Sequence, residues 1–368
     1  MTEPAPTVVV TGAGGQDGFY LLERLLADGC RVHATIRSDA ARAALEGLPN
    51  ADRLTIHALD ITDDQAMRRL IADVLPAELY NLAGLSSVRH SFDDPTAAWR
   101  TNAQAVQGIL EAIRTESPAT RFYQASSTDM FGSSPGGTTV HDERSAFRPE
   151  SPYAASKAAA HVLCDAYRRA FDLRIACGVL SNHESRRRPA SFLTAKVARY
   201  VRELRALQDR GDLQGTRGAN VEPLRVGNLG VRREWGFAPD YVDGMIRICR
   251  QIRVRADVLG APPDPDVGAS YRDYVLGTGR ATAVWELIDR AFRLAGFELE
   301  WDRSSADPAD WSARIRDTGR VAVVVDPSLL RPADPASICT DPVRARRELG
   351  WEPTALLDTF LVEMLALR

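Results

Sequence analysis

Three side chains in the first half of the sequence have the types and the order needed to move a proton. Ser127 ends an apolar run, and the later stretch SPYAASKAAAHVL carries Tyr153 and Lys157, four residues apart. On a helix this spacing places both side chains on one face. A lysine ammonium near a phenol lowers the pKa of the phenol, so Tyr153 could act as a base while Ser127 holds the reacting oxygen. Such pairs are common in helices, so the prediction depends on the order of all three residues.

A carboxylate follows two residues after Ser127. The stretch QASSTDMFG sets Asp129 directly after three hydroxyl side chains, where a strand-like run ends. Parallel sheets bind their ligands beyond the carboxyl ends of the strands. Asp129 is therefore interpreted as a catalytic acid or base rather than as a surface turn residue.

A glycine-rich loop near the N-terminus predicts a dinucleotide site. In TGAGGQDG, the residues Gly12, Gly15 and Gly18 follow a strand-like run and precede a helical pattern. Glycines let backbone N–H groups approach a pyrophosphate at the positive end of the helix. A merely tight turn is the alternative, but the order of strand, loop and helix favours the dinucleotide site.

The end of the second expected strand favours NADP over NAD. That strand ends in ATIRS, which offers Arg37 and no acid for a ribose hydroxyl. Arginine suits the 2′-phosphate of NADP, although exposed arginines are also common at strand ends. Asp60, after the third strand, is expected near the adenine. The small residues of NLAG, after the fourth, would let the backbone lie along the cofactor.

Alternating strands and helices are needed to bring these segments together. Strand-like runs at TVVVTG, CRVHATIR, RLTIHALDI, AELYNLAG and TRFYQASS alternate with amphipathic helical patterns. This alternation predicts an α/β fold with a Rossmann-type, doubly wound parallel sheet and a smaller, partly interleaved C-terminal substrate lobe. We expect an NADP-binding domain at 1–180, with contributions from about 235–252 and 271–295, and a substrate lobe at 181–234 and 296–368.

The composition limits the classes of function. Of the 368 residues, 45% are hydrophobic and 26% are charged, and the net charge of -3 argues against a nucleic-acid-binding surface. The five cysteines include no C-x-x-C pair and are expected to be reduced and buried, not metal ligands. No run reaches about 18 apolar residues, so we expect a cytoplasmic protein without a membrane segment.

Taken together, the ordered motifs resemble one family. The glycine loop, the strand-end hydroxyl and the Tyr-x-x-x-Lys pair are similar to those of extended short-chain dehydrogenase/reductases. GQDG, NHES and REWGFAPDYV resemble the GDP-mannose 4,6-dehydratases in particular, and matching stretches span nearly the whole chain. The resemblance implies a nucleotide-sugar 4,6-dehydratase. Such an enzyme converts GDP-mannose or a related GDP-sugar to the 4-keto-6-deoxy sugar by internal hydride transfer through bound NADP.

The resemblance also implies roles for the catalytic residues. Tyr153, supported by Lys157, would take the C4 hydroxyl proton, and an acid/base group would then remove the C5 proton and help expel the C6 hydroxyl as water. Asp129 stands where the family has glutamate, and Ser127 where it has threonine. Aspartate is one methylene shorter, about 1.5 Å of reach, and misplacement on that scale can cost on the order of a hundredfold in rate.

The matching motifs imply two sets of binding residues. The cofactor set is Gly12, Gly15, Gln16, Asp17, Gly18, Arg37, Asp60, Ile61, Leu82, Ala83, Tyr153, Lys157, His183 and Arg188. The substrate set is Ser86, Ser127, Asn182, Lys196, Arg233, Arg331 and Asp334. Lys196 and Arg233 would hold the nucleotide diphosphate, and Asp334 stands where the family has glutamate. His183 is expected to be a structural hydrogen-bonding residue, and no metal site is expected.

Departures from the family pattern bear on assembly and substrate. The segment IRSDAARAALEGLPNADR is shorter than its family counterpart, which helps to build a tetramer, so a homodimer is expected and a tetramer is the alternative. Excursions at 207–222 and 257–270 are longer than in the family and could reshape the sugar site. An epimerase or a dehydratase for a different sugar or nucleotide stays open. So does a non-catalytic NADP-binding regulator, against which the intact Ser127, Tyr153 and Lys157 argue.

Overall fold

The computed structural model describes residues 6–133, 140–213, 221–251 and 271–367. The expected excursion at 257–270 lies outside the described residues, as does 214–220 within the excursion at 207–222. Residues 207–209, at the start of the excursion at 207–222, are the last residues of helix α8 (Leu193–Asp209).

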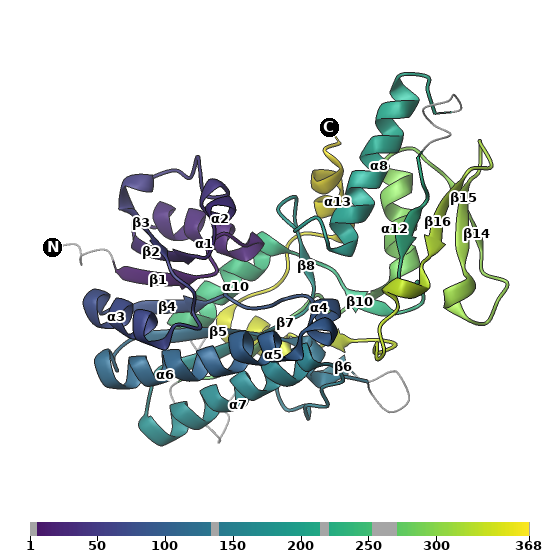
Figure 1. Cartoon of the computed structure of the whole chain (residues 1–368). Coiled ribbons are helices and arrows are strands. Elements are labelled where there is room, and N and C mark those ends of the chain that lie inside the picture. The colour runs from purple at the N-terminus through teal and green to yellow at the C-terminus, as the bar shows by residue number, and fades with distance from the viewer. Residues whose placement is uncertain (1–5, 134–139, 214–220, 252–270, 368) are drawn as a thin grey trace.

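A seven-stranded parallel sheet forms the larger part of the molecule (Figure 1). Its order is β12-β7-β5-β4-β1-β2-β3, and every neighbouring pair is parallel. This confirms the expected doubly wound α/β fold. The strands are β1 (Thr7–Thr11), β2 (Arg31–Ile36), β3 (Leu54–Ala58), β4 (Glu78–Asn81), β5 (Arg121–Ser127), β7 (Ile175–Leu180) and β12 (Tyr274–Leu276).

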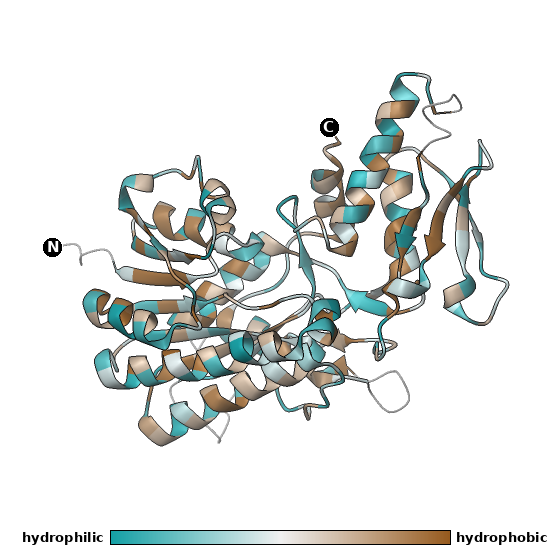
Figure 2. Cartoon of the chain, in the orientation of Figure 1, coloured by the Kyte–Doolittle hydropathy of each residue, from teal (hydrophilic) through white to brown (hydrophobic). Residues whose placement is uncertain are grey.

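Helices cover both faces of this sheet, because its apolar side chains alternate between two cores. Val8 and Val10 of β1 join the core beneath α1 and α10, whereas Val9 joins the core beneath α3 and α6. Figure 2 shows hydrophobic residues along these strands. The helices are α1 (Gln16–Ala27), α2 (Asp39–Ala43), α3 (Asp64–Val74), α4 (Val88–Asp93), α5 (Pro95–Trp99), α6 (Ala105–Glu116), α7 (Pro152–Phe171) and α10 (Ala238–Arg250). Short helical turns are η1 (Ala51–Arg53), η2 (Arg100–Gln104) and η3 (Thr128–Phe131).

A smaller lobe has its own sheet and core. Its strands run in the order β14-β15-β16-β9, with β16 and β9 parallel and the other pairs antiparallel. They are β14 (Leu299–Asp302), β15 (Ser312–Ile315), β16 (Val321–Val325) and β9 (Leu224–Val226). The helices of this lobe are α8 (Leu193–Asp209), α12 (Val284–Leu294) and α13 (Leu357–Leu365), with turns η4 (Pro308–Asp310) and η5 (Pro327–Leu329).

In the part of the chain that the structure describes, three short strand pairs lie outside the two main sheets. They are β8 (His183–Glu184) with β11 (Gly236–Phe237), β10 (Arg232–Glu234) with β13 (Ala281–Ala283), and β6 (Val140–His141) with β17 (Cys339–Thr340).

The two lobes interleave more than the expected boundaries allow. Helix α12 packs in the core of the smaller lobe through Leu287, Ile288 and Phe292, although 271–295 was expected with the larger domain. Conversely, the turn η6 (Ala345–Leu349) and Trp351 pack in the core of the larger domain. An amphipathic pattern reveals that a helix has an apolar face, but not which core that face meets.

Within the described ranges, every helix is too short or too polar to cross a membrane.

Candidate active site

The glycine loop is packed against the segment that follows β4. Gly12 has φ of 69°, and a Cβ at this position would lie 2.6 Å from the Ala83 nitrogen. The Thr11 hydroxyl donates to Asn81 Oδ1 at 2.6 Å and accepts from the Ala83 nitrogen at 3.2 Å. These contacts hold the carboxyl ends of β1 and β4 together, with Leu82 and Ala83 beside the loop.

The GQDG and NHES motifs meet directly. Asp17 Oδ2 lies 2.9 Å from His183 Nε2, and Gln16 Nε2 donates to the His183 carbonyl at 3.0 Å. The Ser185 hydroxyl donates to Gln16 Oε1 at 2.9 Å. Burial opposes charge on both members, but the pair lowers the pKa of Asp17 and raises the pKa of His183. His183 therefore joins the two motifs through hydrogen bonds.

Lys157 is buried on α7 and points at the end of β5. Its ammonium donates to the Ala125 carbonyl at 2.9 Å, and it is 7% exposed. Burial lowers the pKa of Lys157 to about 8, against the opposing effect of Asp17. The adjacent loop is fixed by Asn102, whose side-chain amide bonds both the nitrogen and the carbonyl of Leu85.

Tyr153 is also buried, one turn before Lys157. Its backbone nitrogen donates to the Ser91 hydroxyl at 3.0 Å. Burial raises the pKa of the phenol, the negative charge of Asp129 raises it further, and a hydrogen bond with Ser127 opposes both. The expected lowering of the Tyr153 pKa is wrong for the protein without a bound cofactor. The spacing of Tyr153 and Lys157 does not reveal how completely the phenol ring is removed from water.

Ser127 and Asp129 lie at the end of β5 and in the turn η3. The Asp129 nitrogen donates to the Ser127 hydroxyl at 3.2 Å, so the turn begins with a side-chain cap. Asp129 is half-buried, and its charge acts on both Tyr153 and Arg233. The structure thus brings a hydroxyl, a carboxylate, a phenol and a guanidinium to one edge of the sheet.

Arg233 extends this cluster into the smaller lobe. Its guanidinium donates to Asp334 Oδ1 at 2.6 Å and to the Pro335 carbonyl at 2.7 Å. Arg331 lies 3.4 Å from the same carboxylate. Burial lowers the pKa of Arg233, and the neighbouring carboxylates, led by Asp334, oppose that effect. Asp334 therefore positions Arg233.

The other predicted residues lie on separate segments around these groups. Ser86 is exposed after β4, Asn182 is half-buried between β7 and β8, and Lys196 is half-buried on α8. Arg188 lies 3.1 Å from Glu184 and stacks over a phenyl ring. Beyond the carboxyl ends of β2 and β3, Arg37 lies 3.8 Å from Asp60. Both side chains are largely exposed, whereas Ile61 is buried.

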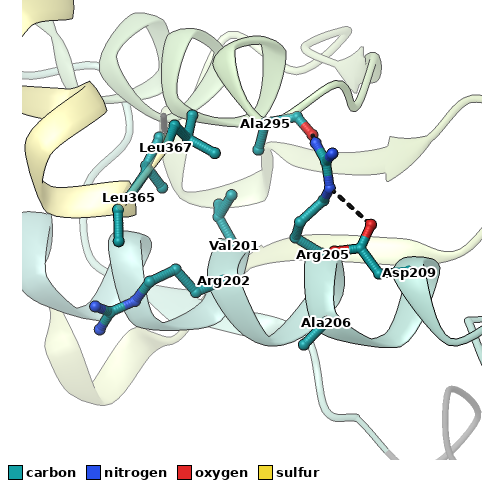
Figure 3. A pocket seen from close by; sticks show the side chains of 9 residues that line it. Val201, Arg202, Arg205, Ala206, Asp209, Ala295, Leu365 and Leu367 are labelled. Atoms are coloured by element: carbon teal, nitrogen blue, oxygen red, sulfur yellow. Dashed lines mark hydrogen bonds and ion pairs between the residues drawn. The ribbon is translucent and has the colours of Figure 1, made fainter.

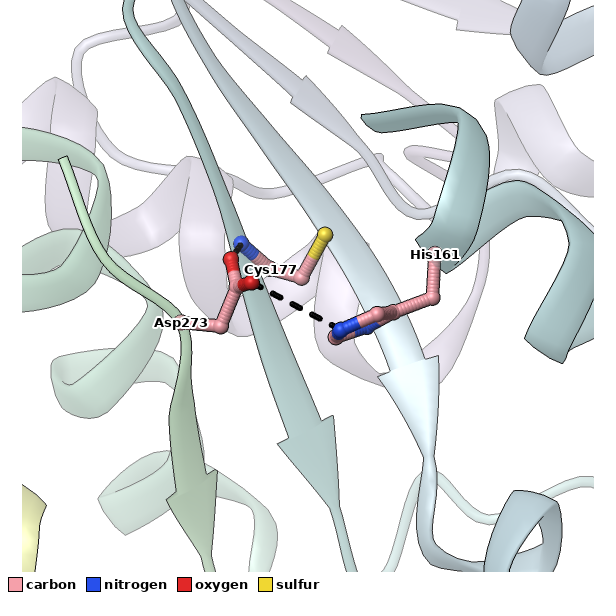
Figure 4. A group of neighbouring side chains, drawn as sticks. All are labelled: His161, Cys177 and Asp273. Carbon is pink, nitrogen blue, oxygen red and sulfur yellow. Dashed lines mark hydrogen bonds and ion pairs between the residues drawn. The ribbon is translucent and has the colours of Figure 1, made fainter. Parts of the chain in front are cut away.

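Two further features lie away from this cluster. A cavity of about 510 Å³ lies between α8 and the C-terminal residues (Figure 3). Behind β5, the side chains of His161, Cys177 and Asp273 meet in a buried group that the sequence did not reveal (Figure 4). The Asp273 carboxylate already accepts from Arg168 at 2.7 and 2.8 Å and from the Cys177 nitrogen at 2.7 Å. We therefore interpret the group as a structural ion-pair network.

Sequence reasoning missed three residues that support the cluster. Asn102 and Ser91 are buried polar side chains that position the segments next to Lys157 and Tyr153. Glu150 binds the residue that follows the Asp129 turn. Asn102 lies in an otherwise apolar helical pattern, which is a usable signal, whereas Glu150 has no local signal because its partner precedes it by 17 residues.

Comparisons with known proteins identify relatives over nearly the whole chain. The chain matches the family model described as GDP-mannose 4,6 dehydratase over residues 9–364. GDP-mannose 4,6 dehydratase 2 from Caenorhabditis elegans is 32% identical over 369 residues, which cover 97% of this chain and 87% of that protein. GDP-mannose 4,6-dehydratase from Sinorhizobium fredii (strain HH103) is 32% identical over 366 residues, covering 97% and 94%.

A solved structure shows the same fold at low sequence identity. The dTDP-glucose 4,6-dehydratase from Bacillus anthracis str. Ames, in complex with NAD, has a TM-score of 0.73 at 16% identity. The match covers 98% of this chain and 96% of that chain.

Proposed function

The chain belongs to the family of GDP-mannose 4,6-dehydratases, and we propose that it converts GDP-mannose or a related GDP-sugar to the 4-keto-6-deoxy sugar. Family membership over nearly the whole chain carries this proposal. Support from geometry comes from Ser127, Asp129 and Tyr153, which interact at the carboxyl end of β5. The reaction is redox-neutral, because the hydride that leaves C4 returns to C6 as water is lost.

The proposed cofactor is NADP. The glycine loop after β1, with α1 beginning at Gln16, suits a pyrophosphate at a helix N-terminus. Arg37 follows β2 with its side chain 65% exposed and no acid in the position that NAD would use. When bound, the oxidised nicotinamide supplies the hydride acceptor and a positive charge that opposes the raised pKa of the Tyr153 phenol.

The residues of the chain move the protons. Ser127 and Tyr153 hold the C4 oxygen, and Tyr153 takes its proton as hydride leaves C4. Lys157 stabilises the phenolate from the same helix face. The new 4-keto group acidifies the C5 proton, which Asp129 removes and then delivers to the departing C6 hydroxyl. Once the hydride has returned to C6, C5 takes a proton from solvent, and Tyr153 gives up the proton that it took from the C4 hydroxyl.

The reaction in deuterated water with a panel of nucleotide sugars tests this proposal. From GDP-mannose we expect a product that has lost one water and gained deuterium at C5. An isomer of unchanged formula would instead show epimerisation. We keep an epimerase as the second candidate function because Asp129 is one methylene shorter than the glutamate of the family. No turnover of any sugar, together with tight NADP binding, would indicate a regulator.

Removing the Asp129 carboxylate should stop water loss without loss of NADP. For Asp129→Asn we expect dehydration to fall by about a hundredfold or more, as general acid–base catalysis implies. Asp129→Glu is the matched control, since it keeps the charge and restores the side-chain length of the family. Near-normal dehydration by Asp129→Asn would mean that another group removes the C5 proton.

Cofactor preference can be tested at the end of β2. Arg37→Asp places an acid where NAD would present a ribose hydroxyl and removes the partner of the 2′-phosphate. We expect the ratio of affinities, NADP over NAD, to fall by at least about tenfold, measured by calorimetry on protein freed of nucleotide. An unchanged ratio would show that Arg37 does not contact the 2′-phosphate.

For assembly we propose a homodimer through the long helices. On α5 and α7, the side chains of Trp99, Val162 and Phe171 are 51%, 56% and 48% exposed. Contact with a second copy would remove these exposed apolar side chains from water. Light scattering after gel filtration distinguishes the dimer from a tetramer, and a monomer would contradict the proposal.

A further inference from the structure

The turn that carries Asp129 is fastened to the segment that leads into α7. Gly132, which ends the turn, has φ of 63°, and a Cβ there would overlap the Arg148 carbonyl oxygen. The Arg148 nitrogen donates to the Met130 carbonyl at 2.8 Å. The two segments therefore approach each other closely along their backbones.

Glu150 completes this contact with both carboxylate oxygens. Oε1 accepts from the Ser133 backbone nitrogen at 2.7 Å, and Oε2 accepts from the Ser133 hydroxyl at 2.9 Å. A bidentate carboxylate of this kind fixes both the position and the direction of the segment that it binds.

The same short segment fixes the start of α7. Ser151, the next residue, caps the helix by accepting from the Ala154 nitrogen at 3.1 Å, and Tyr153 lies in the first helical turn. Glu150 thus lies between the two elements whose side chains must work on neighbouring carbons of the sugar.

Glu150 also shares an electrostatic partner with Asp129. The charges of both carboxylates oppose the burial that lowers the pKa of Arg233, with Asp129 the stronger of the two. Both oxygens of Glu150 are occupied by Ser133, whereas among the described residues the Asp129 carboxylate has no hydrogen bond of this kind. The two acids are therefore suited to different tasks.

We propose that Glu150 is a positioning residue, which sets the distance from the Asp129 carboxylate to the substrate held by Tyr153. The inference rests on the proposed dehydratase function. A short acid has little reach to spare, so the backbone that carries it must be held firmly. Misplacement by about 1 Å can cost on the order of a hundredfold in rate.

The test separates hydride transfer from C5 proton removal in one protein. Single turnovers with GDP-mannose report the first step through reduced nicotinamide absorbance and the second through deuterium uptake at C5. For Glu150→Ala we expect the first step within about twofold of the parent, and water loss slowed by about ten- to a hundredfold, with KM little changed.

Two variants separate the hydrogen bonds of Glu150 from its charge. Glu150→Gln keeps the volume and an acceptor for the Ser133 nitrogen, so it should retain most of the rate of water loss. Ser133→Ala removes one of the two bonds at an exposed residue and should slow water loss by a smaller factor than Glu150→Ala. It also serves as the test if Glu150→Ala fails to fold.

Asp142→Asn is the matched control, because this acid also binds backbone in the same segment, but its carboxylate accepts from Arg144 and Ser145 and not from the turn. It should leave both steps unchanged. Equal slowing of both steps in Glu150→Ala, or no slowing of either, would overturn the proposal. If the parent protein turns over no GDP-sugar, the proposed function itself fails and this inference fails with it. Normal turnover by the parent with unaffected variants refutes Glu150 alone.

Discussion

Lysine is rare in this chain, and its placement is informative. Lys157 and Lys196 are the only two lysines among 46 lysine and arginine residues. Both were expected in the site from motifs. Arginine stays charged in proteins and presents a rigid fork, whereas lysine offers a compact charge whose pKa shifts readily on burial. At Lys157, burial lowers the pKa of the ammonium to about 8. An arginine at this position would not respond to burial in this way, because its guanidinium stays charged.

The ammonium of Lys157 should be costly to stability. Because its pKa is lowered on folding from 10.5 to about 8, the folded state disfavours the charged form. This penalty is complete below pH 8 and is relieved as the pH rises from about 8 to 10.5. A shift of this size corresponds to roughly 3 kcal/mol.

Lys157→Met should therefore lose activity and gain thermal stability at pH 7. The gain should shrink as the pH is raised toward 10, and thermal unfolding followed at several pH values measures it. Lys157→Arg is the control, since it keeps a charge that cannot be lost. A lower melting temperature for Lys157→Met at pH 7 would show that the ammonium stabilises the fold.

Much of the site at the residue scale was accessible from the sequence, but its electrostatics were not. Motif order identified Ser127, Asp129 and Tyr153, and the structure places them in mutual contact or within electrostatic reach. The direction of the Tyr153 pKa was wrong, because desolvation depends on groups from distant segments. Glu150 was missed for the same reason, since its partner is defined only by the fold.

At the scale of elements, the buried network behind β5 ties α7 to β7 and to the approach to β12. Arg168 on α7 pairs with Asp273 through both guanidinium nitrogens, while Asp273 also accepts from the Cys177 nitrogen. His161, on the same helix, lies 3.5 Å from Asp273 and 3.1 Å from the Ser126 hydroxyl. One carboxylate thus supports three neighbouring elements.

Asp273→Ala should be strongly destabilising, because it leaves the buried Arg168 without its bidentate partner and, among the described residues, with only the more exposed Asp165 as a counter-charge. Removing one member of a buried pair costs about 3–5 kcal/mol, which urea unfolding can measure. Asp165→Ala is the matched control, since Asp165 also bonds Arg168 but is 36% exposed, and it should cost less than about 1 kcal/mol. Equal effects of the two substitutions would contradict the role assigned to Asp273.

Strand positions were predictable because β-branched runs and turns are local signals. All five strands expected in the first half occur in the sheet, where they occupy adjacent places in the order β5-β4-β1-β2-β3. The placement of α12 and of Trp351 was not predictable, because each packs in a core formed by residues from other segments.

At the scale of the whole molecule, one arginine joins the two lobes beside the expected nucleotide site. Arg89 on α4 donates to the Ser328 carbonyl at 2.9 Å and the Leu330 carbonyl at 3.2 Å, directly before Arg331. The larger domain thereby holds the loop of the smaller lobe that presents Arg331.

Arg89→Ala should weaken nucleotide-sugar binding more than catalysis. We expect KM to rise by about tenfold, as loss of roughly one charge-assisted contact implies, with kcat within about twofold. Arg53→Ala is the control, because Arg53 also bonds a carbonyl, that of Gly29, but within the larger domain. A fall in kcat at unchanged KM would place Arg89 in the chemistry instead.

The pairing of GQDG with NHES has a consequence for biosynthesis. Asp17 and His183 are 166 residues apart, so a ribosome exposes the first motif long before its partner emerges. At a synthesis rate of about 5–20 residues per second, roughly ten to thirty seconds pass between the synthesis of Asp17 and that of His183. A fragment ending at residue 180 would carry every glycine of the motif and still lack the groups that hold its first helical turn. The dinucleotide domain is therefore completed only late in translation and cannot be excised as a contiguous piece.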